Sequence, residues 1–299
     1  MARRFAYRAL FLFVVTAAAA SGQFVIKKQP DIVLPEPPPI ILGEEKEEEP
    51  EVLPEGTTVY EGPVISLSTV CDVNRLEYAG IRCSADRPCD LFLELVSASS
   101  EGNWVVLTGE VHTADATYES VVLSSKDGGL TWTESAERVP AGGIESISII
   151  DAETAFVAGQ QGDTATGEIP FLLVTDDGGE SWDTRMVTTG SEKVEGLVVA
   201  FQADTTSHGY LILEQLAATG DPYRLYETYN GGRSWSIRQI SADKPQIPGA
   251  RLALRTEDWG VRPDVASGEF IVAKRSSSEL SGWADQGRFA GAVGSCPLP

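Results

Sequence analysis

A short glycine-containing pattern occurs three times in the 299-residue chain and constrains its fold more than any other feature. Each copy has Ser or Thr, Asp or Asn two positions later, two glycines, and Trp three positions after the second glycine. The three tryptophans lie 50 and 53 positions apart. A repeat of this length can hold one small antiparallel sheet. The pattern residues are Ser125, Asp127, Gly129, Trp132, Thr175, Asp177, Gly179, Trp182, Thr228, Asn230, Gly232 and Trp235.

Each copy is interpreted as a tight turn between two strands. The Asp or Asn side chain accepts hydrogen bonds from N–H groups of the turn, and glycine adopts the positive φ that the turn needs. The Trp begins the returning strand, where we expect it to be largely buried against a neighbouring sheet, with its N–H on an acceptor. These residues are therefore assigned structural roles.

Alternating apolar residues around the turns predict four strands in each repeat. The repeats span about 89–136, 144–187, 195–241 and 250–289, and the fourth has lost the turn pattern. The sequence thus predicts an all-β fold, a small β-propeller of four or five four-stranded antiparallel blades that contain these turns. Two more predicted strands, at 64–70 and 290–295, are expected to form a further sheet from the two ends of the folded region.

The turns resemble Asp-box (BNR) repeats, Ser/Thr-x-Asp-x-Gly-x-Ser/Thr-Trp, with Asn230 replacing Asp in the third copy. Such repeats occur in sialidases, sortilin-type receptors and photosystem II assembly factor-like propellers. The resemblance therefore implies a propeller without choosing between an enzyme and a binding protein. Most members have six or more blades, and residues 63–299 are too few for six at this period.

The segment before the repeats has the composition of an export signal and a linker. Arg3, Arg4 and Arg8 precede an uncharged apolar run over 9–20, which is too short to span a bilayer and predicts a signal peptide at 1–22. Residues 23–62 are rich in Pro and Glu and are predicted to be a disordered acidic linker. The folded domain is assigned to 63–299, and the protein is expected to be periplasmic or secreted.

Four cysteines in an exported chain predict two disulfide bonds, for which three pairings are possible. We favour Cys83 with Cys89, which closes a short loop, and Cys71 with Cys296, which joins the start and end of the folded region. A zinc site is disfavoured because paired Cys-x-x-Cys units are missing and His112 and His208 are remote in sequence.

The formal net charge of −21 makes nucleic acid and anionic membranes poor partners, since no basic stripe runs along the chain. Six arginines, Arg224, Arg233, Arg238, Arg251, Arg255 and Arg262, fall in the last third and could form an anion-binding patch or be scattered. Scattering is favoured because strand alternation sends neighbours to opposite faces.

Catalytic motifs are missing from the sequence. A sialidase-like site would need an arginine triad, a Tyr–Glu pair and a Phe/Tyr-Arg-Ile-Pro segment, and that segment does not occur. No Gly-x-Ser-x-Gly elbow is present, and Asp176–Asp177 is explained by its turn. We therefore predict no catalytic, cofactor-binding or metal-binding residue, and a non-enzymatic propeller that binds or assembles other exported proteins.

One alternative stays open, a small carbohydrate-active or glycan-binding protein related to sialidase-type propellers. Under either hypothesis the contact positions are loops joining the second and third strands of successive repeats. These loops, 113–117, 160–169 and 217–223, are expected to fall on one rim of the domain.

Overall fold

The computed structural model describes residues 60–84, 86–163, 167–215, 220–249, 257–276 and 282–296. The chain divides into two units, Met1–Glu51 and Val52–Pro299, and every described residue belongs to the second. The predicted signal peptide at 1–22 and residues 23–59 of the predicted linker lie outside the described residues. Within the described ranges, no helix combines the length and apolar character that a membrane span requires.

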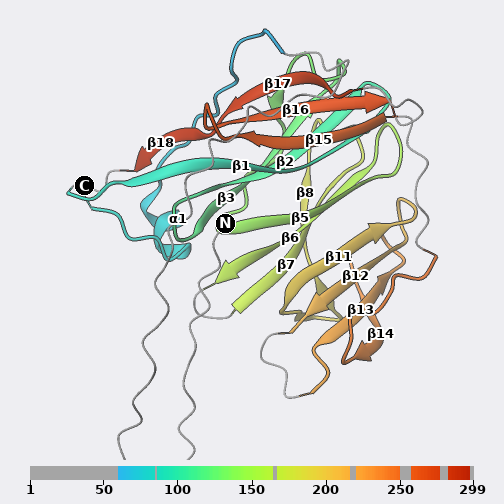
Figure 1. Ribbon diagram of the computed structural model, residues 1–299. Coiled ribbons are helices and arrows are strands. Elements are labelled where there is room, and N and C mark those ends of the chain that lie inside the picture. Colours follow the sequence, from blue (N-terminus) through green and yellow to red (C-terminus); the bar gives the residue numbers. More distant parts are fainter. Residues whose placement is uncertain are drawn as a thin grey trace, which may run out of the picture. The chain divides into compact units, whose positions relative to one another are not determined.

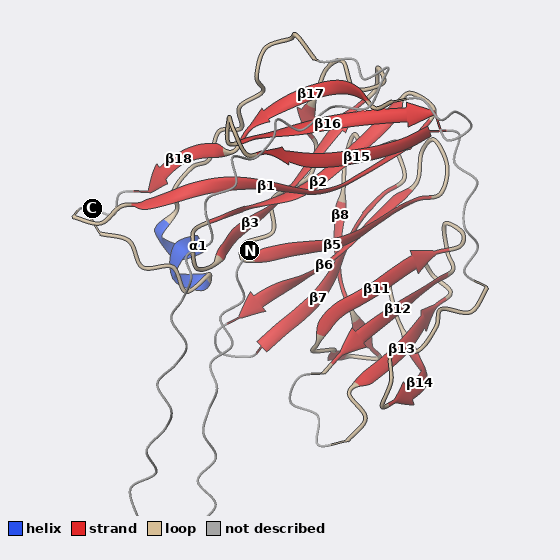
Figure 2. Ribbon diagram, viewed as in Figure 1, coloured by secondary structure: helices blue, strands red, loops and turns tan. Residues whose placement is uncertain are grey.

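The described part is all-β, with antiparallel sheets and one short helix (Figures 1 and 2). The helix, α1 (Val73–Tyr78), begins after Asp72, whose carboxylate accepts hydrogen bonds from the N–H groups of Asn74 and Arg75. This N-cap satisfies two of the backbone donors that a helix leaves open at its start.

Four sheets follow one another along the sequence, and their strand order is mostly sequential. The first contains β1 (Cys89–Glu101), β2 (Trp104–His112), β3 (Thr117–Ser125) and β4 (Thr133–Glu134), with β18 (Ala292–Cys296) beside β1. The second contains β5 (Gly142–Ile149), β6 (Ala155–Asp163), β7 (Gly167–Thr175) and β8 (Asp183–Met186). The third contains β11 (Leu197–Ala203), β12 (Gly209–Glu214), β13 (Tyr223–Thr228) and β14 (Ser236–Ser241).

The fourth sheet contains β15 (Glu257–Asp264), β16 (Glu269–Ser276) and β17 (Ala284–Ala290). The strand predicted at 251–255 lies outside the described residues. A two-stranded ribbon, β9 (Thr188–Thr189) and β10 (Glu192–Lys193), connects the second sheet to the third.

The repeated pattern forms a hydrogen-bonded turn between the third and fourth strands of the first three sheets. In the first turn, Asp127 Oδ1 accepts from the N–H groups of Leu130 and Thr131 at 3.0 and 2.9 Å. Ser125 Oγ accepts from the N–H of Gly129 at 2.8 Å, and Gly129 has φ of 93°. The turn is thus held by its own side chains.

The other two turns repeat this arrangement. Asp177 Oδ1 accepts from the Ser181 N–H at 3.0 Å, and Thr175 Oγ1 accepts from the Gly179 N–H at 2.9 Å. In the third turn, Asn230 Oδ1 accepts from the Ser234 N–H at 2.9 Å, so an amide replaces the carboxylate without loss of that bond.

The pattern tryptophans differ in burial, contrary to the uniform burial expected for them. Trp235 is 3% exposed, whereas Trp132 and Trp182 are only partly buried. Each of the three directly precedes an outer strand, and the backbone N–H of Trp235 donates to the carbonyl of Thr188 in β9 at 3.0 Å. The Trp182 indole N–H donates to Ser135 Oγ at 3.0 Å, whereas the Trp235 indole N–H is buried without an acceptor among the described residues.

Neighbouring sheets meet through their first strands and through the second glycine of each turn. β1 packs against β5 and β15, and β5 packs against β11. A Cβ added to Gly179 would lie 3.1 Å from the Trp104 ring in the preceding sheet, and the same added to Gly129 would lie 3.0 Å from the Trp259 ring. Close approach at these junctions therefore requires glycine.

A closed ring of four blades is not shown by the described residues. The main contacts link the sheets in the order fourth, first, second and third. Each of these three junctions contains a turn glycine, Gly129, Gly179 or Gly232, that lies against the neighbouring sheet. The fourth repeat lacks the turn pattern in its sequence, and residues 277–281 between β16 and β17 lie outside the described residues.

The two ends of the folded region extend existing sheets, so the further sheet predicted from them is wrong. β18 pairs with β1, and Ile65 pairs beside β17, where its N–H donates to the Arg288 carbonyl at 2.7 Å. Each terminal segment thereby covers an edge that would otherwise present unpaired backbone groups.

Two disulfide bonds are present. Cys71 is bonded to Cys296, with Cα atoms 5.5 Å apart, and Cys83 is bonded to Cys89, with Cα atoms 5.3 Å apart. The first bond joins the segment before α1 to the end of β18, across 225 residues of sequence. It therefore fixes the C-terminal strand beside β1.

Candidate functional site

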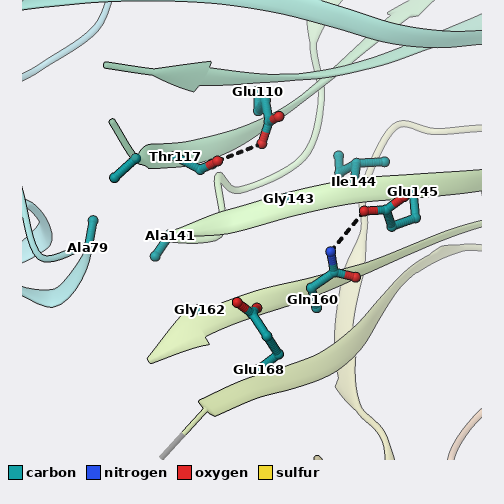
Figure 3. A pocket seen from close by; sticks show the side chains of 11 residues that line it. Ala79, Glu110, Thr117, Ala141, Gly143, Ile144, Glu145, Gln160, Gly162 and Glu168 are labelled. Atoms are coloured by element: carbon teal, nitrogen blue, oxygen red, sulfur yellow. Dashed lines mark hydrogen bonds between the residues drawn. The ribbon is translucent and has the colours of Figure 1, made fainter. Parts of the chain in front are cut away.

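A cavity of about 420 Å³ opens where the β2–β3 hairpin, the start of β5 and the β6–β7 hairpin come together (Figure 3). In these antiparallel sheets, the start of the first strand, the end of the second and the start of the third lie at the same end. The cavity therefore collects side chains from one end of two adjacent sheets. Its polar lining residues include Glu110, Thr117, Glu145, Gln160 and Glu168.

Three carboxyl groups from three strands line this cavity, Glu110 near the end of β2, Glu145 in β5 and Glu168 at the start of β7 (Figure 3). Glycines leave room for two of them. A Cβ added to Gly143 would lie 3.4 Å from Glu110 Oε2, and one added to Gly162 would lie 3.6 Å from Glu168 Oε1. Both glycines therefore lie within van der Waals range of a carboxyl group of the cavity.

Glu110 is held by a hydroxyl group and is partly removed from water. Thr117 Oγ1 donates a hydrogen bond to Glu110 Oε2 at 2.9 Å. Burial raises the pKa of Glu110 above 4.5, the Thr117 hydrogen bond lowers it in part, and the charges of Glu94 and Glu145 raise it further. His112 acts weakly in the opposite direction. On balance Glu110 keeps its proton to a higher pH than an exposed glutamate does.

Glu168 lines the cavity from β7, and burial raises the pKa of its carboxyl group as well. The described residues provide no side-chain hydrogen bond to it. The cavity thus contains two carboxyl groups whose protonated form is favoured by removal from water.

Glu145 occupies a β-bulge, which explains why its side chain reaches the cavity. The pairing of β5 with β6 shifts between Ile144 and Ser146, so Glu145 is the extra residue. A bulge redirects the side chain of its extra residue. The first strands of the first and third sheets have the same irregularity at Val96 and Val199, where the side chain is apolar.

Gln160 fixes the position of Glu145. Its side-chain N–H donates to Glu145 Oε1 at 2.8 Å, and its Oε1 accepts from the Val198 N–H at 3.1 Å. Because Val198 belongs to β11, the amide is anchored to the third sheet while it contacts a carboxylate of the second.

The arrangement is suited to proton transfer. Within the described residues, no group of three or more His, Cys, Asp or Glu side chains is placed to hold a metal ion. A carboxyl group with a raised pKa keeps a proton that it can donate, while a second, ionised carboxylate acts as a base or nucleophile. Cleavage of a glycosidic bond is one reaction that uses a pair of carboxyl groups in this way.

Two of the three predicted contact loops line the cavity. The 113–117 loop contributes Ala116 and Thr117, and the 160–169 loop contributes Gln160, Gly162 and Glu168. The 217–223 loop is only partly described, and none of its residues lines this cavity. The turn residues and the cysteines also lie outside the cavity lining.

The six arginines of the last third, for which scattering was favoured over a patch, are only partly described. Arg238 pairs with Glu227 at 2.9 Å and Arg262 pairs with Asp285 at 3.4 Å, while Arg251 and Arg255 lie outside the described residues. Since Arg238 and Arg262 are on different sheets and each has its own acidic partner, they do not form a common anion site.

No family model matches the chain, and no curated protein matches it. Solved structures do match. The endosialidase of phage phi92 has a TM-score of 0.41 at 11% identity, over 69% of this chain and 50% of that one. An ulvan lyase of a new polysaccharide lyase family has a TM-score of 0.39 at 9% identity, over 71% and 54%. The chain thus spans about half the length of either protein.

A β-xylosidase/α-arabinofuranosidase from a compost microbial metagenome is also similar, with a TM-score of 0.35 at 14% identity over 69% of this chain and 81% of that one. These scores assign no activity to the chain. The structures are nevertheless all enzymes, and this finding contradicts the prediction that the chain is not an enzyme.

Sequence motifs could not reveal the carboxyl groups of this cavity, because no local pattern contains them. Glu110, Glu145 and Glu168 come from three strands that are far apart in sequence and meet only after the sheets have packed.

Proposed function

We propose that this protein is an extracytoplasmic carbohydrate-active enzyme whose catalytic site is the cavity containing Glu110, Glu145 and Glu168. The observation that carries the proposal is the convergence of three carboxyl groups on one cavity, two of them with pKa values raised by burial. Buried titratable groups in a concave pocket are characteristic of functional sites.

Glu110 is assigned the role of proton donor. It is the carboxyl group that combines a raised pKa with a fixed orientation, which the Thr117 hydroxyl provides. Glu145 is assigned the role of ionised base or nucleophile, since it is exposed to solvent and receives a hydrogen bond from the Gln160 amide. Glu168 faces the same cavity and would bind sugar hydroxyl groups.

The size and lining of the cavity support a sugar ligand. Its volume of about 420 Å³ lies within the range of about 300–1,000 Å³ typical of small-molecule sites. Thr117, Gln160 and the carboxyl groups offer both donors and acceptors, which a ligand with several hydroxyl groups can satisfy together.

The fold and compartment are part of the proposal. We propose that the four sheets are blades of a small Asp-box propeller. The hydrogen bonds within the three turns support this proposal. The two disulfide bonds are typical of an oxidising, extracytoplasmic compartment, and a signal peptide at 1–22 would direct the chain there. A glycan is the proposed partner.

The test is a screen of the oxidised, exported protein against neutral, amino and acidic polysaccharides, with release of new chain ends as the measurement. Glu110→Gln, Glu145→Gln and Glu168→Gln are compared with Glu101→Gln, an exposed glutamate that does not line the cavity. We expect the wild type and Glu101→Gln to cleave one class, and Glu110→Gln and Glu145→Gln to lose that activity. Binding without cleavage, or no binding, would contradict the catalytic assignment.

A further inference from the structure

A second hollow adjoins the proposed catalytic cavity. This hollow has a volume of about 760 Å³, and its lining shares Ala116 with the first cavity. The neighbouring residues Ala79 and Gly80 also line one hollow each. The tip of the β2–β3 hairpin, residues 113–116, therefore forms a ridge between two adjoining depressions.

This ridge is fixed by its own hydrogen bonds. The Thr113 N–H donates to the Ala116 carbonyl at 2.8 Å, and Thr113 Oγ1 accepts from the N–H groups of Ala116 and Asp115 at 3.2 and 3.3 Å. The next residue, Thr117, holds Glu110. A ligand lying over the ridge would thus be placed directly beside the proposed proton donor.

The second hollow is also shaped by fixed backbone. The loop between Cys83 and Cys89 is closed by their disulfide bond. Within it, Ser84 and Arg87 exchange backbone hydrogen bonds of 2.9 and 3.0 Å, and the Arg87 N–H also donates to Ser84 Oγ at 3.1 Å. Binding to a preformed surface loses little free energy to ordering of the protein.

The side chains around this hollow combine an aromatic face with hydrogen-bonding groups of both kinds. Phe92 lines it with a ring that is 39% exposed. Arg82 and Arg87 provide donors, and Asp90 and Asp115 provide acceptors. Within the described residues, neither arginine forms an ion pair.

This combination matches the chemistry of a sugar unit. A pyranose ring has an apolar face of C–H groups, which packs on an aromatic ring, and an equatorial rim of hydroxyl groups, which both donate and accept. The two arginines and two aspartates balance in charge, so neither a polyanion nor a polycation is favoured at this place. A lipid or an apolar peptide would leave the charged groups without partners.

We propose that the second hollow is a further sugar-binding subsite, with Phe92 as its stacking platform, and that the substrate is a glycan chain whose units lie across the Ala116 ridge into the catalytic cavity. The inference rests on the proposed function and adds that the substrate is an oligosaccharide or polysaccharide. A single sugar would contact only one of the two hollows.

The test measures binding to an array of neutral, amino and carboxylated glycans, each present as chains of one to six units. Wild type, Phe92→Ala and Arg87→Ala are compared with Leu130→Ala, an exposed apolar residue that lines neither hollow. Phe92 and Arg87 both have partly or largely exposed side chains, so two independent variants report on the subsite. Melting curves confirm that each variant is folded.

We expect wild type and Leu130→Ala to bind longer chains at least about tenfold more tightly than single units, as one added stacking contact of about 1.4 kcal/mol would give. Phe92→Ala should lose this gain in affinity and bind single units as the wild type does. Arg87→Ala should reduce the affinity for the longer chains only.

Affinity that does not increase with chain length would overturn the subsite and leave the proposed function intact. The same conclusion follows if Phe92→Ala reduces the affinity for single units and for longer chains equally. Failure of the wild type to bind any glycan would instead overturn both proposals.

Discussion

The hydroxyl of Thr117, the first residue of β3, donates a hydrogen bond of 2.9 Å to Glu110 Oε2 near the end of β2. One hairpin therefore contains both the proposed proton donor and the group that orients it. Since this bond lowers the pKa of Glu110 against the opposing effect of burial, the bond adjusts both position and acidity.

Thr117→Val should raise the pKa of Glu110, because it removes the hydrogen bond that favours the charged form. Thr117→Ser keeps the hydroxyl group and should leave the pKa close to that of the wild type. The measurement is NMR titration of the Glu110 side-chain carboxyl carbon, which needs no substrate. An equal pKa in the wild type and the Val variant would show that the bond has no electrostatic effect.

Glu110→Gln should make the protein more stable at pH 7. When the pKa of a carboxyl group is higher in the folded state than in the unfolded state, its ionisation destabilises the folded protein. The free energy of unfolding therefore falls as the pH rises from below 4.5 through the folded pKa. The neutral amide avoids this loss and can still accept from Thr117. We expect a higher Tm for the variant at pH 7 and nearly equal Tm values at pH 3.

Glu101→Gln is the control for this comparison, since the exposed Glu101 lies at the end of β1 and not in the cavity. A Tm at pH 7 lower in Glu110→Gln than in the wild type would indicate that Glu110 stabilises the fold, which is the opposite of what a functional carboxyl group is expected to do.

The first turn should contribute a stability that is lost in acid. Hydrogen bonds from the Thr131 side chain and backbone, and from Ser125, lower the pKa of Asp127 to about 2. A lowered pKa gives stability that is present above 3.8 and is lost as the pH falls towards 2. The free energy of unfolding of Asp127→Asn should therefore decrease less than that of the wild type over this pH range. Urea denaturation at each pH measures both.

The third turn supplies the reverse experiment. Asn230 accepts the equivalent backbone bond without titrating, so Asn230→Asp should add acid sensitivity in the same window. If neither variant changes how steeply the free energy of unfolding falls between pH 4 and pH 2, the turn carboxylates do not contribute to acid unfolding.

Burial predicts different costs for two tryptophans of the repeated pattern. Trp235 is 3% exposed, so Trp235→Ala should destabilise the protein by about 3–5 kcal/mol through cavity formation. Trp182 is partly exposed, and its replacement by Ala should cost less despite the loss of the bond to Ser135. Urea denaturation measures both costs, and a larger cost at Trp182 would contradict the assumption that burial of the ring sets the difference.

Local chemistry made most of the sheet content predictable from sequence. The Asp-Gly-Gly and Asn-Gly-Gly turns determine where strands reverse, because their hydrogen bonds involve only residues within a few positions. The disulfide between Cys71 and Cys296 followed from a longer-range argument, that the two ends of the folded region should meet.

The site could not be predicted in the same way. Glu145 reaches the cavity through a bulge, and a one-residue shift in pairing leaves little trace in the amino-acid pattern. Glu110 and Glu168 acquire raised pKa values only when two sheets pack together. Gly143 and Gly162 lie beside Glu110 and Glu168, but only the packed sheets reveal this, so these glycines gave no signal in the sequence.

The most direct test of the proposed site compares cleavage of two substrates of the same glycan by the wild type and Glu110→Gln, one with a sugar leaving group and one with a nitrophenyl leaving group. A sugar alkoxide needs a proton to depart, whereas nitrophenolate departs readily without one. If Glu110 is the proton donor, the variant should lose about 10²–10⁴-fold in rate on the first substrate and much less on the second. Equal losses on both substrates, or full activity of the variant, would contradict the role of Glu110.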